Sequence, residues 1–141
     1  MGARRVARER ALQALYQVEQ NPAVVTVDAL EAAWSASDDE GGREPASHAF
    51  ALELIDGVRS HLTEVDAMLE EHSHNWRLDR MARVDRNVLR LGVFELQYCL
   101  DIPRKVTINE AIELAKKFGN EESPAFINGL LDRVAVAVNK A

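Results

Sequence analysis

Hydrophobic side chains recur at helical spacing along almost the whole chain. Between Ala3 and Gln20, the small and apolar residues fall on a single stripe of a helix. These residues are Ala7, Ala11, Ala14, Leu15 and Val18. Arg4 and Arg8 lie on the same side of this helix but nearer its start. We therefore expect the helix to extend past the core and to place these guanidinium groups at the rim of a groove, where they precede the buried stripe.

Capping signals mark the starts of several later helices. Asp28 and Glu31 have the spacing of a capping box, and Ser47 is expected to cap the next helix. Thr107 and Glu110 form a second candidate capping box. The polar, Gly-rich residues 35–46 separate two of these helices and predict a flexible loop.

The segment from Met81 to Leu100 is apolar on nearly every side, which is typical of a helix at the centre of a bundle. Only a narrow polar strip interrupts it: Asp85, Arg86, Arg90 and Glu95. We expect Asp85 to be exposed at a seam of the bundle, where it either meets a basic residue of a partner protein or pairs with a neighbouring arginine.

The last two helices are bounded by typical helix-end residues. Gly119 is expected to end one helix in the C′ position, and Ser123 with Pro124 to open the next. Gly129 is expected to permit close helix packing. No segment has a strand pattern and no long period repeats. The sequence thus predicts an all-α bundle of about seven helices, with residues 1–141 forming one domain.

Composition is consistent with a folded protein outside the membrane. The 141 residues are 47% hydrophobic and 28% charged, and no apolar run is long enough to span a bilayer. No apolar signal-peptide core follows the basic N-terminus. The single cysteine, Cys99, excludes an internal disulfide and suits a reducing compartment, so we expect a cytoplasmic protein.

Charge is distributed unevenly along the chain. Residues 1–10 hold four arginines and one glutamate, net +3, within a chain of net charge −6. A basic arm on an acidic body predicts a local anionic partner. The alternative is that these arginines only solvate a helix end.

The sequence contains no constellation that points to catalysis, a cofactor or a metal. It has neither a P-loop nor a dinucleotide-binding glycine motif. Cys99 lies in an apolar helix and is expected to be a buried structural thiol. His72 and His74 are two residues apart, so on a helix they would face different ways, and a surface loop or helix end explains them better than a metal site.

Four stretches of the chain, in this order and spacing, resemble the NusB family of transcription antitermination proteins. They are A-R-R-x-A-R-E-x-A-L-Q-A-L-Y at 3–16, V-D-R-N-V-L-R-L-G-V-F-E-L at 84–96, P-R-K-V-T-I-N-E-A-I-E-L-A-K-K-F-G at 103–119, and S-P-A-F-I-N-G-L-L-D at 123–132. The chain departs from some relatives at Val6, where they have another arginine.

The resemblance implies an all-α fold of two packed helical subdomains and a role in RNA recognition. It implies binding to the boxA element of nascent RNA, jointly with the small-subunit ribosomal protein that doubles as NusE, within the RNA polymerase antitermination complex. The RNA-binding residues it implies are Arg4, Arg5, Arg8, Phe118 and Glu122.

The chemistry of the side chains adds Lys116 to this set and supports Phe118. Lys116 gives local positive charge before Phe118, and an aromatic ring at a helix end can stack on an unpaired base. The alternative for Phe118 is a core residue that closes the helix. For the NusE-type partner, the resemblance implies Tyr16, Asp79 and Asp85, although Tyr16 could equally be an ordinary residue of an amphipathic helix.

Two other functions fit the same residues. One is an accessory RNA-binding domain of an RNA methyltransferase, which would require a catalytic domain, because no Gly-rich cofactor-binding segment follows the helical module. The other is a helical protein-interaction module that does not bind RNA. Measuring RNA binding with and without the N-terminal arginines distinguishes the last from an antitermination factor.

Overall fold

The computed structural model describes residues 2–37, 44–74 and 77–141. Within these ranges the chain forms seven α-helices and one short 3-10 helix, with no strand, so the all-α prediction is confirmed. The chain divides into two compact units, Met1–Ser60 and His61–Ala141. No helix of the described residues has both the length and the apolar character that crossing a bilayer requires.

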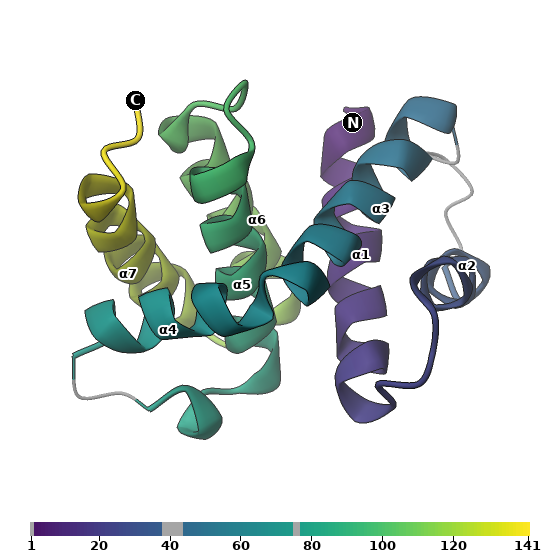
Figure 1. Ribbon diagram of the computed structural model, residues 1–141, viewed down its shortest axis with the longest axis horizontal. Coiled ribbons are helices and arrows are strands. Elements are labelled where there is room, and N and C mark those ends of the chain that lie inside the picture. Colours follow the sequence, from purple (N-terminus) through teal and green to yellow (C-terminus); the bar gives the residue numbers. More distant parts are fainter. Residues whose placement is uncertain (1, 38–43, 75–76) are drawn as a thin grey trace. The chain divides into compact units, whose positions relative to one another are not determined.

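The first unit contains three helices, α1 (Ala3–Gln20), α2 (Thr26–Ser35) and α3 (Pro45–Ser60). The helix α1 packs against both α2 and α3, as Figure 1 shows. The buried stripe of α1 that the sequence predicted is present, since all five of its residues are buried. Opposite it lie apolar side chains of the other two helices, including Leu30, Trp34, Leu54, Ile55 and Val58.

The second unit is built around one central helix. It contains α4 (Leu62–His72), the 3-10 helix η1 (Leu78–Arg80), α5 (Arg83–Tyr98), α6 (Arg104–Phe118) and α7 (Ser123–Ala137). The helix α5 packs against α4, α6 and α7, and Val88, Leu89 and Val93 on it are fully buried. The prediction that the most apolar helix lies at the centre of its bundle is therefore confirmed. Cys99, just after α5, is buried as expected.

Close helix packing depends on a different glycine from the one expected. A Cβ atom on Gly92 would lie 2.7 Å from Leu131 Cδ1 and 2.9 Å from its Cδ2, so α5 approaches α7 closely at this point. A Cβ on Gly129 would meet only the Arg133 side chain, at 3.7 Å. The assignment of Gly129 to close packing was wrong, because this glycine does not lie at a tight helix–helix contact.

The two predicted capping boxes are absent, because the helices begin earlier than the sequence suggested. The helix α2 starts at Thr26 after Val25, with no side-chain cap. The helix α6 starts at Arg104 after Pro103, which places Thr107 inside the helix. Buried there, the Thr107 hydroxyl donates a hydrogen bond of 2.9 Å to Glu95 Oε1.

Ser47 was also wrongly expected to be a cap. The helix α3 begins at Pro45, and Ser47 is fully buried within its first turn. Its Oγ donates a hydrogen bond of 2.9 Å to the carbonyl oxygen of Ala3. A small hydroxyl that looked like a local cap therefore joins two helices that are far apart in the sequence.

Part of the polar strip of α5 is buried, contrary to expectation. Asp85 is 9% exposed and Glu95 is 2% exposed. Arg90 lies nearer the surface and forms a two-pronged ion pair with Asp66 of α4, with N–O distances of 2.8 and 2.9 Å. The strip thus faces neighbouring helices, and Asp85 is not the exposed acid that the sequence indicated.

The two predicted helix ends near α7 are close to their expected positions. Gly119 is the C-cap of α6, but its φ of −95° is not left-handed, so it is not the C′ glycine expected. A Cβ on Gly119 would lie 2.6 Å from Ser123 Oγ, so a glycine is needed because the chain passes so close to Ser123. The helix α7 begins at Ser123 with Pro124 in its first turn, but its N-cap is Glu122, so the expectation that Ser123 is the cap was wrong. Residues 38–43 of the loop predicted over 35–46 lie outside the described residues.

Candidate nucleic-acid interface

The N-terminal arginines gather around a single aromatic ring of the first unit. The Arg4 guanidinium carbon lies 4.6 Å from the centre of the Phe50 ring, and that of Arg8 lies 5.3 Å from it. Phe50 comes from α3, so the ring and the two cations are brought together by the packing of α1 on α3. Such cation–π contacts hold a guanidinium in place without neutralising its charge.

Burial differs sharply among these arginines. Arg4 is exposed and Arg5 is half-buried, whereas Arg8 is only 4% exposed. Arg10, which adds to the charge of the arm, is also buried and donates a hydrogen bond of 2.6 Å to Ser37 Oγ. The expectation that the arginines precede the buried part of the helix is therefore wrong for Arg8. Its replacement would affect the fold as well as the charge.

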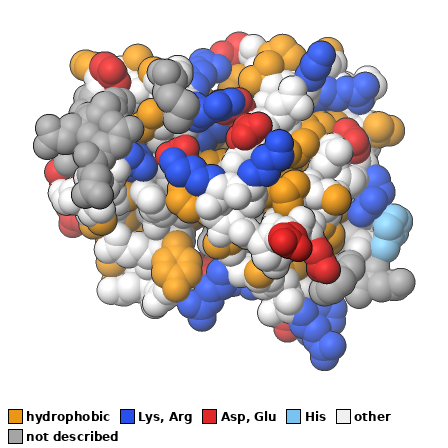
Figure 2. All heavy atoms as spheres, turned by 180° about the vertical axis from the view of Figure 1, so that it is seen from behind, with side chains coloured by type: hydrophobic (Ala, Val, Ile, Leu, Met, Phe, Trp, Pro, Cys, Tyr) orange, Lys and Arg blue, Asp and Glu red, His pale blue; other side chains and the backbone are white. Residues whose placement is uncertain are grey.

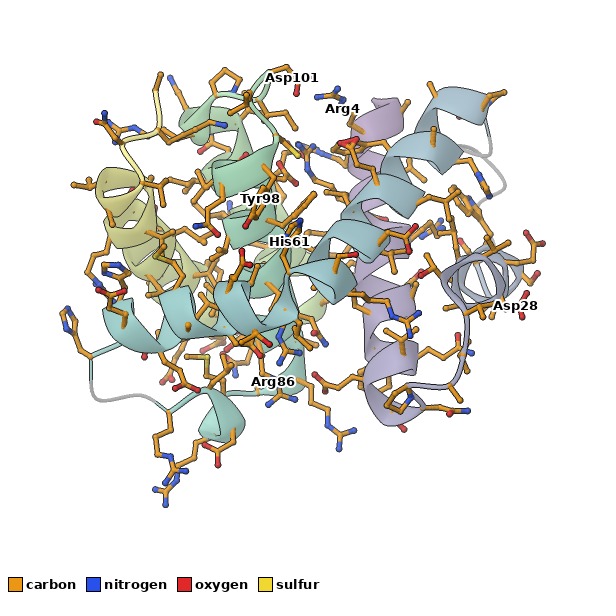
Figure 3. All side chains as sticks on the ribbon, in the orientation of Figure 1. Arg4, Asp28, His61, Arg86, Tyr98 and Asp101 are labelled. Carbon is orange, nitrogen blue, oxygen red and sulfur yellow. The ribbon has the colours of Figure 1, made fainter. Side chains whose placement is uncertain are left out.

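The start of α1 is positioned by contacts to its own unit. Gly2 is its N-cap without a side-chain hydrogen bond, and no acidic residue occupies the first turn. The bond from Ser47 to the Ala3 carbonyl joins this turn to α3. Figure 3 shows Arg4 at this end of α1. The positive end of the helix dipole and the exposed Arg4 together favour an anion here.

The second predicted group of RNA-binding residues lies at the corner between α6 and α7. Lys116 is exposed and pairs with Glu113 at 3.8 Å, one turn earlier. Phe118 is half-buried, and the Lys117 ammonium lies 5.5 Å from the centre of its ring. Phe118 is thus neither fully enclosed in the core nor fully exposed, and part of its surface is accessible to a ligand.

The turn after Phe118 has a defined shape. Asn120 Oδ1 accepts hydrogen bonds from the backbone N–H groups of Glu122, at 2.9 Å, and Ser123, at 3.1 Å. Ser123 Oγ in turn accepts a hydrogen bond of 3.1 Å from the Asn120 N–H. These bonds fix the corner and present the exposed Glu122 beside the start of α7.

A hollow of about 200 Å³ in the second unit brings together residues assigned to two different ligands. Glu122, predicted to lie near RNA, and Asp85, predicted to contact the partner protein, both line it. The other lining residues are Arg80, Met81, Ala82, Asn120 and Phe126. Asp85 Oδ1 is buried there and has no hydrogen-bond partner within the described part of the chain. An unpaired carboxylate oxygen in a hollow is suited to accept a hydrogen bond from a basic or amide group of a ligand.

The other two residues predicted for the partner are exposed. Tyr16 of α1 is 45% exposed, so it is not a core residue of its helix. Asp79 lies on η1 and pairs with Arg77, with 3.3 Å between Arg77 Nε and Asp79 Oδ1. Tyr16 belongs to the first unit, whereas Asp79 and Asp85 belong to the second.

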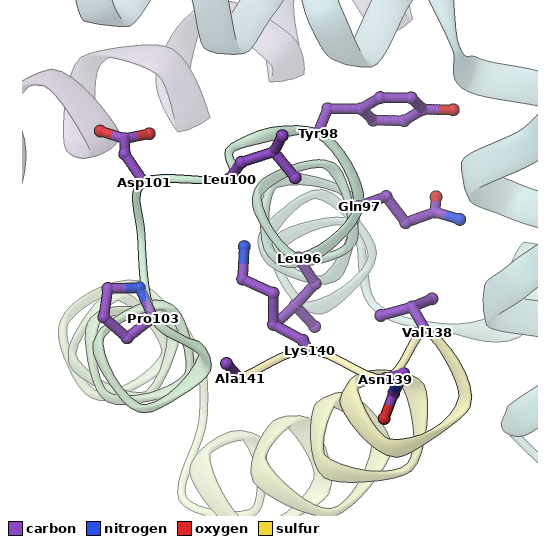
Figure 4. Close-up of a pocket in the computed structure, with 10 residues that line it drawn as sticks. All are labelled: Leu96, Gln97, Tyr98, Leu100, Asp101, Pro103, Val138, Asn139, Lys140 and Ala141. Atoms are coloured by element: carbon purple, nitrogen blue, oxygen red, sulfur yellow. The ribbon is translucent and has the colours of Figure 1, made fainter.

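A larger hollow of about 540 Å³ lies elsewhere in the second unit and contains none of the predicted site residues (Figure 4). Its walls come from the end of α5, the link to α6 and the residues after α7. Lys140 lies among them and donates a hydrogen bond of 2.7 Å to the carbonyl oxygen of Cys99. This ammonium satisfies a carbonyl at the C-terminal end of α5, which explains its position structurally.

Charged side chains of both signs are distributed over the surface. On the face drawn in Figure 2, lysine and arginine side chains are interspersed with acidic and hydrophobic ones. In the ranges that the structure describes, no group of three or more His, Cys, Asp or Glu residues is arranged to hold a metal ion. His72 is half-buried beside Glu71, at 4.0 Å, and His74 is exposed.

Comparison with known proteins identifies the family. The NusB family profile matches residues 5–136. The chain belongs to the NusB family. The transcription antitermination protein NusB of Myxococcus xanthus is 67% identical over 99% of both chains, and that of Geotalea uraniireducens is 51% identical over 96% of this chain and 95% of its own. This is a family of transcription antitermination factors and not of enzymes.

Solved NusB structures have the same fold. The NusB protein of T. maritima is 39% identical, with a TM-score of 0.81 over 94% of this chain and 90% of its own. A chain from a crystal structure of antitermination factors NusB and NusE in complex with dsRNA is 26% identical, with a TM-score of 0.83 over 96% of this chain and 97% of its own. The fold predicted from the four NusB motifs is therefore confirmed.

Two residues near the site were not singled out by sequence reasoning. Arg80 and Phe126 line the same hollow as Glu122, although they are distant from each other in the sequence. Phe126 lies on α7, three residues after the Ser123 that opens this helix, and is half-buried. The signal in the sequence for Phe126 was an aromatic residue in the first turn after the corner.

Proposed function

We propose that this NusB-family chain is a cytoplasmic transcription antitermination factor that binds boxA-type single-stranded RNA together with a NusE-type small-subunit ribosomal protein. In this role it joins the RNA polymerase antitermination complex and supports ribosomal RNA transcription. The name of its relatives and the NusB–NusE–RNA composition of one solved structure support this proposal.

The observation that carries the RNA part is the arrangement at the start of α1. Exposed Arg4 and buried Arg8 both contact the Phe50 ring, and Ser47 joins the first turn to α3. The guanidinium groups are thus partly ordered before any ligand binds, which reduces the entropy lost on binding. Arginine forks bind phosphates through two parallel hydrogen bonds and also stack on unpaired bases.

The hollow of the second unit supports joint binding of RNA and protein. Glu122 of the α6–α7 corner and Asp85 of α5 line the same hollow. A strand of RNA at the corner and a partner protein at Asp85 would therefore lie next to each other. Asp85 Oδ1, buried without a hydrogen-bond partner in the described ranges, is a suitable acceptor for a basic side chain of the partner.

The RNA part is tested by replacing the two arginines that the fold needs least. In Arg4→Gln/Arg5→Gln, affinity for boxA-type RNA should fall, because fewer counterions are released when the RNA binds. The slope of log affinity against log salt should become shallower by about 1.4, at ~0.7 for each lost contact to a single strand. Filter binding or fluorescence anisotropy over a salt series measures both quantities.

The matched control removes two positive charges from the second unit, with Arg104→Gln/Lys105→Gln, where both residues are exposed. This control should leave the slope close to that of the wild type. Equal slopes for the wild type and the Arg4/Arg5 variant would instead favour a helical interaction module whose arginines only solvate a helix end.

The partner part is tested with Asp85→Asn, because the buried position of Asp85 makes a lysine there damaging to the fold as well. Loss of one member of a buried charge pair commonly costs ~2–5 kcal/mol of binding. Affinity for the NusE-type protein should therefore fall at least tenfold, while RNA binding by the isolated protein changes little. Calorimetric titration measures this, with exposed Asp101→Asn as the control. A fall in thermal stability with partner affinity unchanged would show that Asp85 acts only within the bundle.

A further inference from the structure

A second group of arginines lies outside the predicted RNA-binding residues. Arg77, Arg80 and Arg83 follow one another at intervals of three residues, and all three are exposed. We propose that this 77–83 arginine segment binds backbone phosphates of single-stranded RNA that flanks the boxA-type element. The inference rests on the proposed function and extends its RNA path across the second unit.

Arg77 and Arg80 bracket one short turn of the chain. Arg77 is the N-cap of η1 and Arg80 its last residue, and the Arg80 N–H donates a hydrogen bond of 3.0 Å to the Arg77 carbonyl. Met81 and Ala82 are extended, with ψ of 147° and 143°, so they carry the chain onward to Arg83 at the start of α5. The three exposed arginines thus follow one another along a short, defined stretch of backbone, an arrangement suited to successive phosphates of a strand.

The backbone under this path is held by the rest of the unit. Leu78 and Met81 are buried, and the Met81 N–H donates a hydrogen bond of 3.2 Å to the Leu78 carbonyl. Arg86 Nη1 donates a further bond of 3.3 Å to the same carbonyl. Figure 3 shows Arg86 beside this turn. Arg86 therefore positions the segment from inside, whereas Arg77, Arg80 and Arg83 are exposed.

Charge distinguishes the segment from its surroundings. Residues 77–86 hold four arginines and two aspartates, net +2, although residues 61–141 as a whole sum to −2. This is the same signature as the N-terminal arm, a basic stretch on an acidic body. All the cations of the stretch are arginines, which remain charged at any physiological pH and bind phosphate oxygens bidentately.

The segment is continuous with the predicted RNA-binding corner. Arg80 lines the same hollow as Glu122 and Asn120 of the α6–α7 turn. Arg80 and Glu122 line one hollow of about 200 Å³, so an RNA strand bound at this corner could continue past the hollow to Arg80. Asp85, proposed to contact the protein partner, lines this hollow too, so the choice of RNA rests on the arginines, whose guanidinium groups bind phosphates bidentately.

Asp79 lies between the arginines and competes with the phosphates. Its contacts with Arg77 are 3.3 and 3.4 Å long, and both side chains are about 70% exposed. An ion pair this exposed contributes little and is screened by salt. A polyanion can therefore displace Asp79 from Arg77 at small cost.

The test compares Arg77→Gln/Arg80→Gln with the wild type on two RNAs, a boxA-type element alone and the same element with unstructured flanking nucleotides. On the flanked RNA, the variant should lose about 1.4 from the slope of log affinity against log salt, at ~0.7 for each lost phosphate contact. On the element alone the slopes should differ much less. Arg77→Lys/Arg80→Lys, which keeps the charge, should recover most of the slope.

Arg104→Gln/Lys105→Gln serves again as the control of equal charge in the same unit, and circular dichroism verifies that each variant is folded. Equal slopes for wild type and variant on the flanked RNA would overturn the inference, as would an equal loss in the control pair. Loss of affinity for the NusE-type protein with RNA binding intact would assign the segment to the protein partner and overturn it too.

A flanked RNA without a boxA-type sequence separates this inference from the proposed function. If the wild type binds it as tightly as the boxA-type RNA, and the Arg77/Arg80 variant still loses slope, the boxA assignment fails while the inference stands. If the wild type prefers boxA-type RNA and the variant keeps the full slope, the inference fails while the proposed function stands.

Discussion

At the scale of single residues, the surroundings of a side chain determine what its chemistry does. Arg4 and Arg8 share the Phe50 ring, yet Arg4 is exposed and Arg8 is 4% exposed. The first can bind a ligand directly, whereas the second also belongs to the packing of its unit. Asp85 shows the same dependence, because its buried Oδ1 lines a hollow, where it is suited to accept a hydrogen bond and is not a solvated surface charge.

Replacing the helical glycines Gly92 and Gly129 by alanine should have different effects on the stability of the protein. An alanine at either position gains about 0.5–1 kcal/mol of helix stability over glycine. At Gly92 the new Cβ would overlap the fully buried Leu131, and overpacking a core costs roughly 1–3 kcal/mol. Gly92→Ala should therefore be destabilising, and Gly129→Ala neutral or stabilising, when urea unfolding is followed by circular dichroism. The reverse order would show that Leu131 can move away without cost.

At the scale of elements, aromatic and ionic contacts hold α4 on α5. The His61 ring, just before α4, stacks on Tyr98 at 4.1 Å between centres, as Figure 3 illustrates. Tyr98 donates a hydrogen bond of 2.5 Å to Glu64 Oε2 on α4. Two residues further along α4, Asp66 pairs with Arg90 of α5. The contact between the two helices is thus polar at its surface edge and apolar beneath.

The Tyr98–Glu64 bond predicts a dependence of stability on alkaline pH. The hydrogen bond to Glu64 raises the pKa of Tyr98 above its ordinary value of 10.0, with smaller contributions from desolvation and from the charge of Glu64. The folded state therefore holds this proton more tightly than the unfolded state does. The stabilisation is fully present below pH 10 and is lost as pH rises through the raised pKa.

This prediction is measured by urea unfolding between neutral pH and pH 11 for the wild type and for Tyr98→Phe. The wild type should lose stability above about pH 10 more steeply than Tyr98→Phe, which lacks the titrating group. Glu64→Gln should resemble Tyr98→Phe, because the carboxylate that raises the pKa is absent. Parallel curves for all three proteins would show that the bond does not persist in solution.

At the scale of the whole molecule, arginines cluster in two short stretches of a chain whose net charge is −6. Both units are acidic overall, and each carries one cluster of arginines, at residues 1–10 and 77–86. An acidic body disfavours indiscriminate binding to polyanions, whereas a local basic cluster allows a positioned strand to bind. We expect RNA binding to be strongly dependent on salt for this reason.

The salt dependence of RNA binding can be measured on the intact chain as the rise in Tm that RNA produces. A ligand present at a hundred times its dissociation constant stabilises the folded state by about 2.7 kcal/mol, which corresponds to a rise in Tm of roughly 5–10 °C for a chain of this size. BoxA-type RNA should produce such a rise at low salt and a much smaller one at high salt, with the protein alone at each salt concentration as the reference. A rise of the same size at both salt concentrations would contradict binding through phosphate contacts.

The sequence by itself determined the fold class, the order of the helices and the family. Helical periodicity is a local property, so the stripe of α1 and the apolar surface of α5 could be read directly from residue spacing. The four motifs likewise carried the family assignment, because they depend on residue identity and order alone. The approximate end of α6 and start of α7 followed from Gly119 and Pro124 for the same reason.

Only the tertiary structure decided the roles of polar residues and glycines. Thr107 and Ser47 looked like helix caps, but each hydroxyl bonds to a residue on another helix, Glu95 and Ala3 respectively. The hollow that joins Arg80 to Glu122, and the close approach of Gly92 to Leu131, also depend on residues far apart in the sequence. Helix spacing shows on which face of its own helix a side chain lies. It does not show which residue of another helix that face meets, and that contact determines burial, hydrogen bonding and access to a ligand.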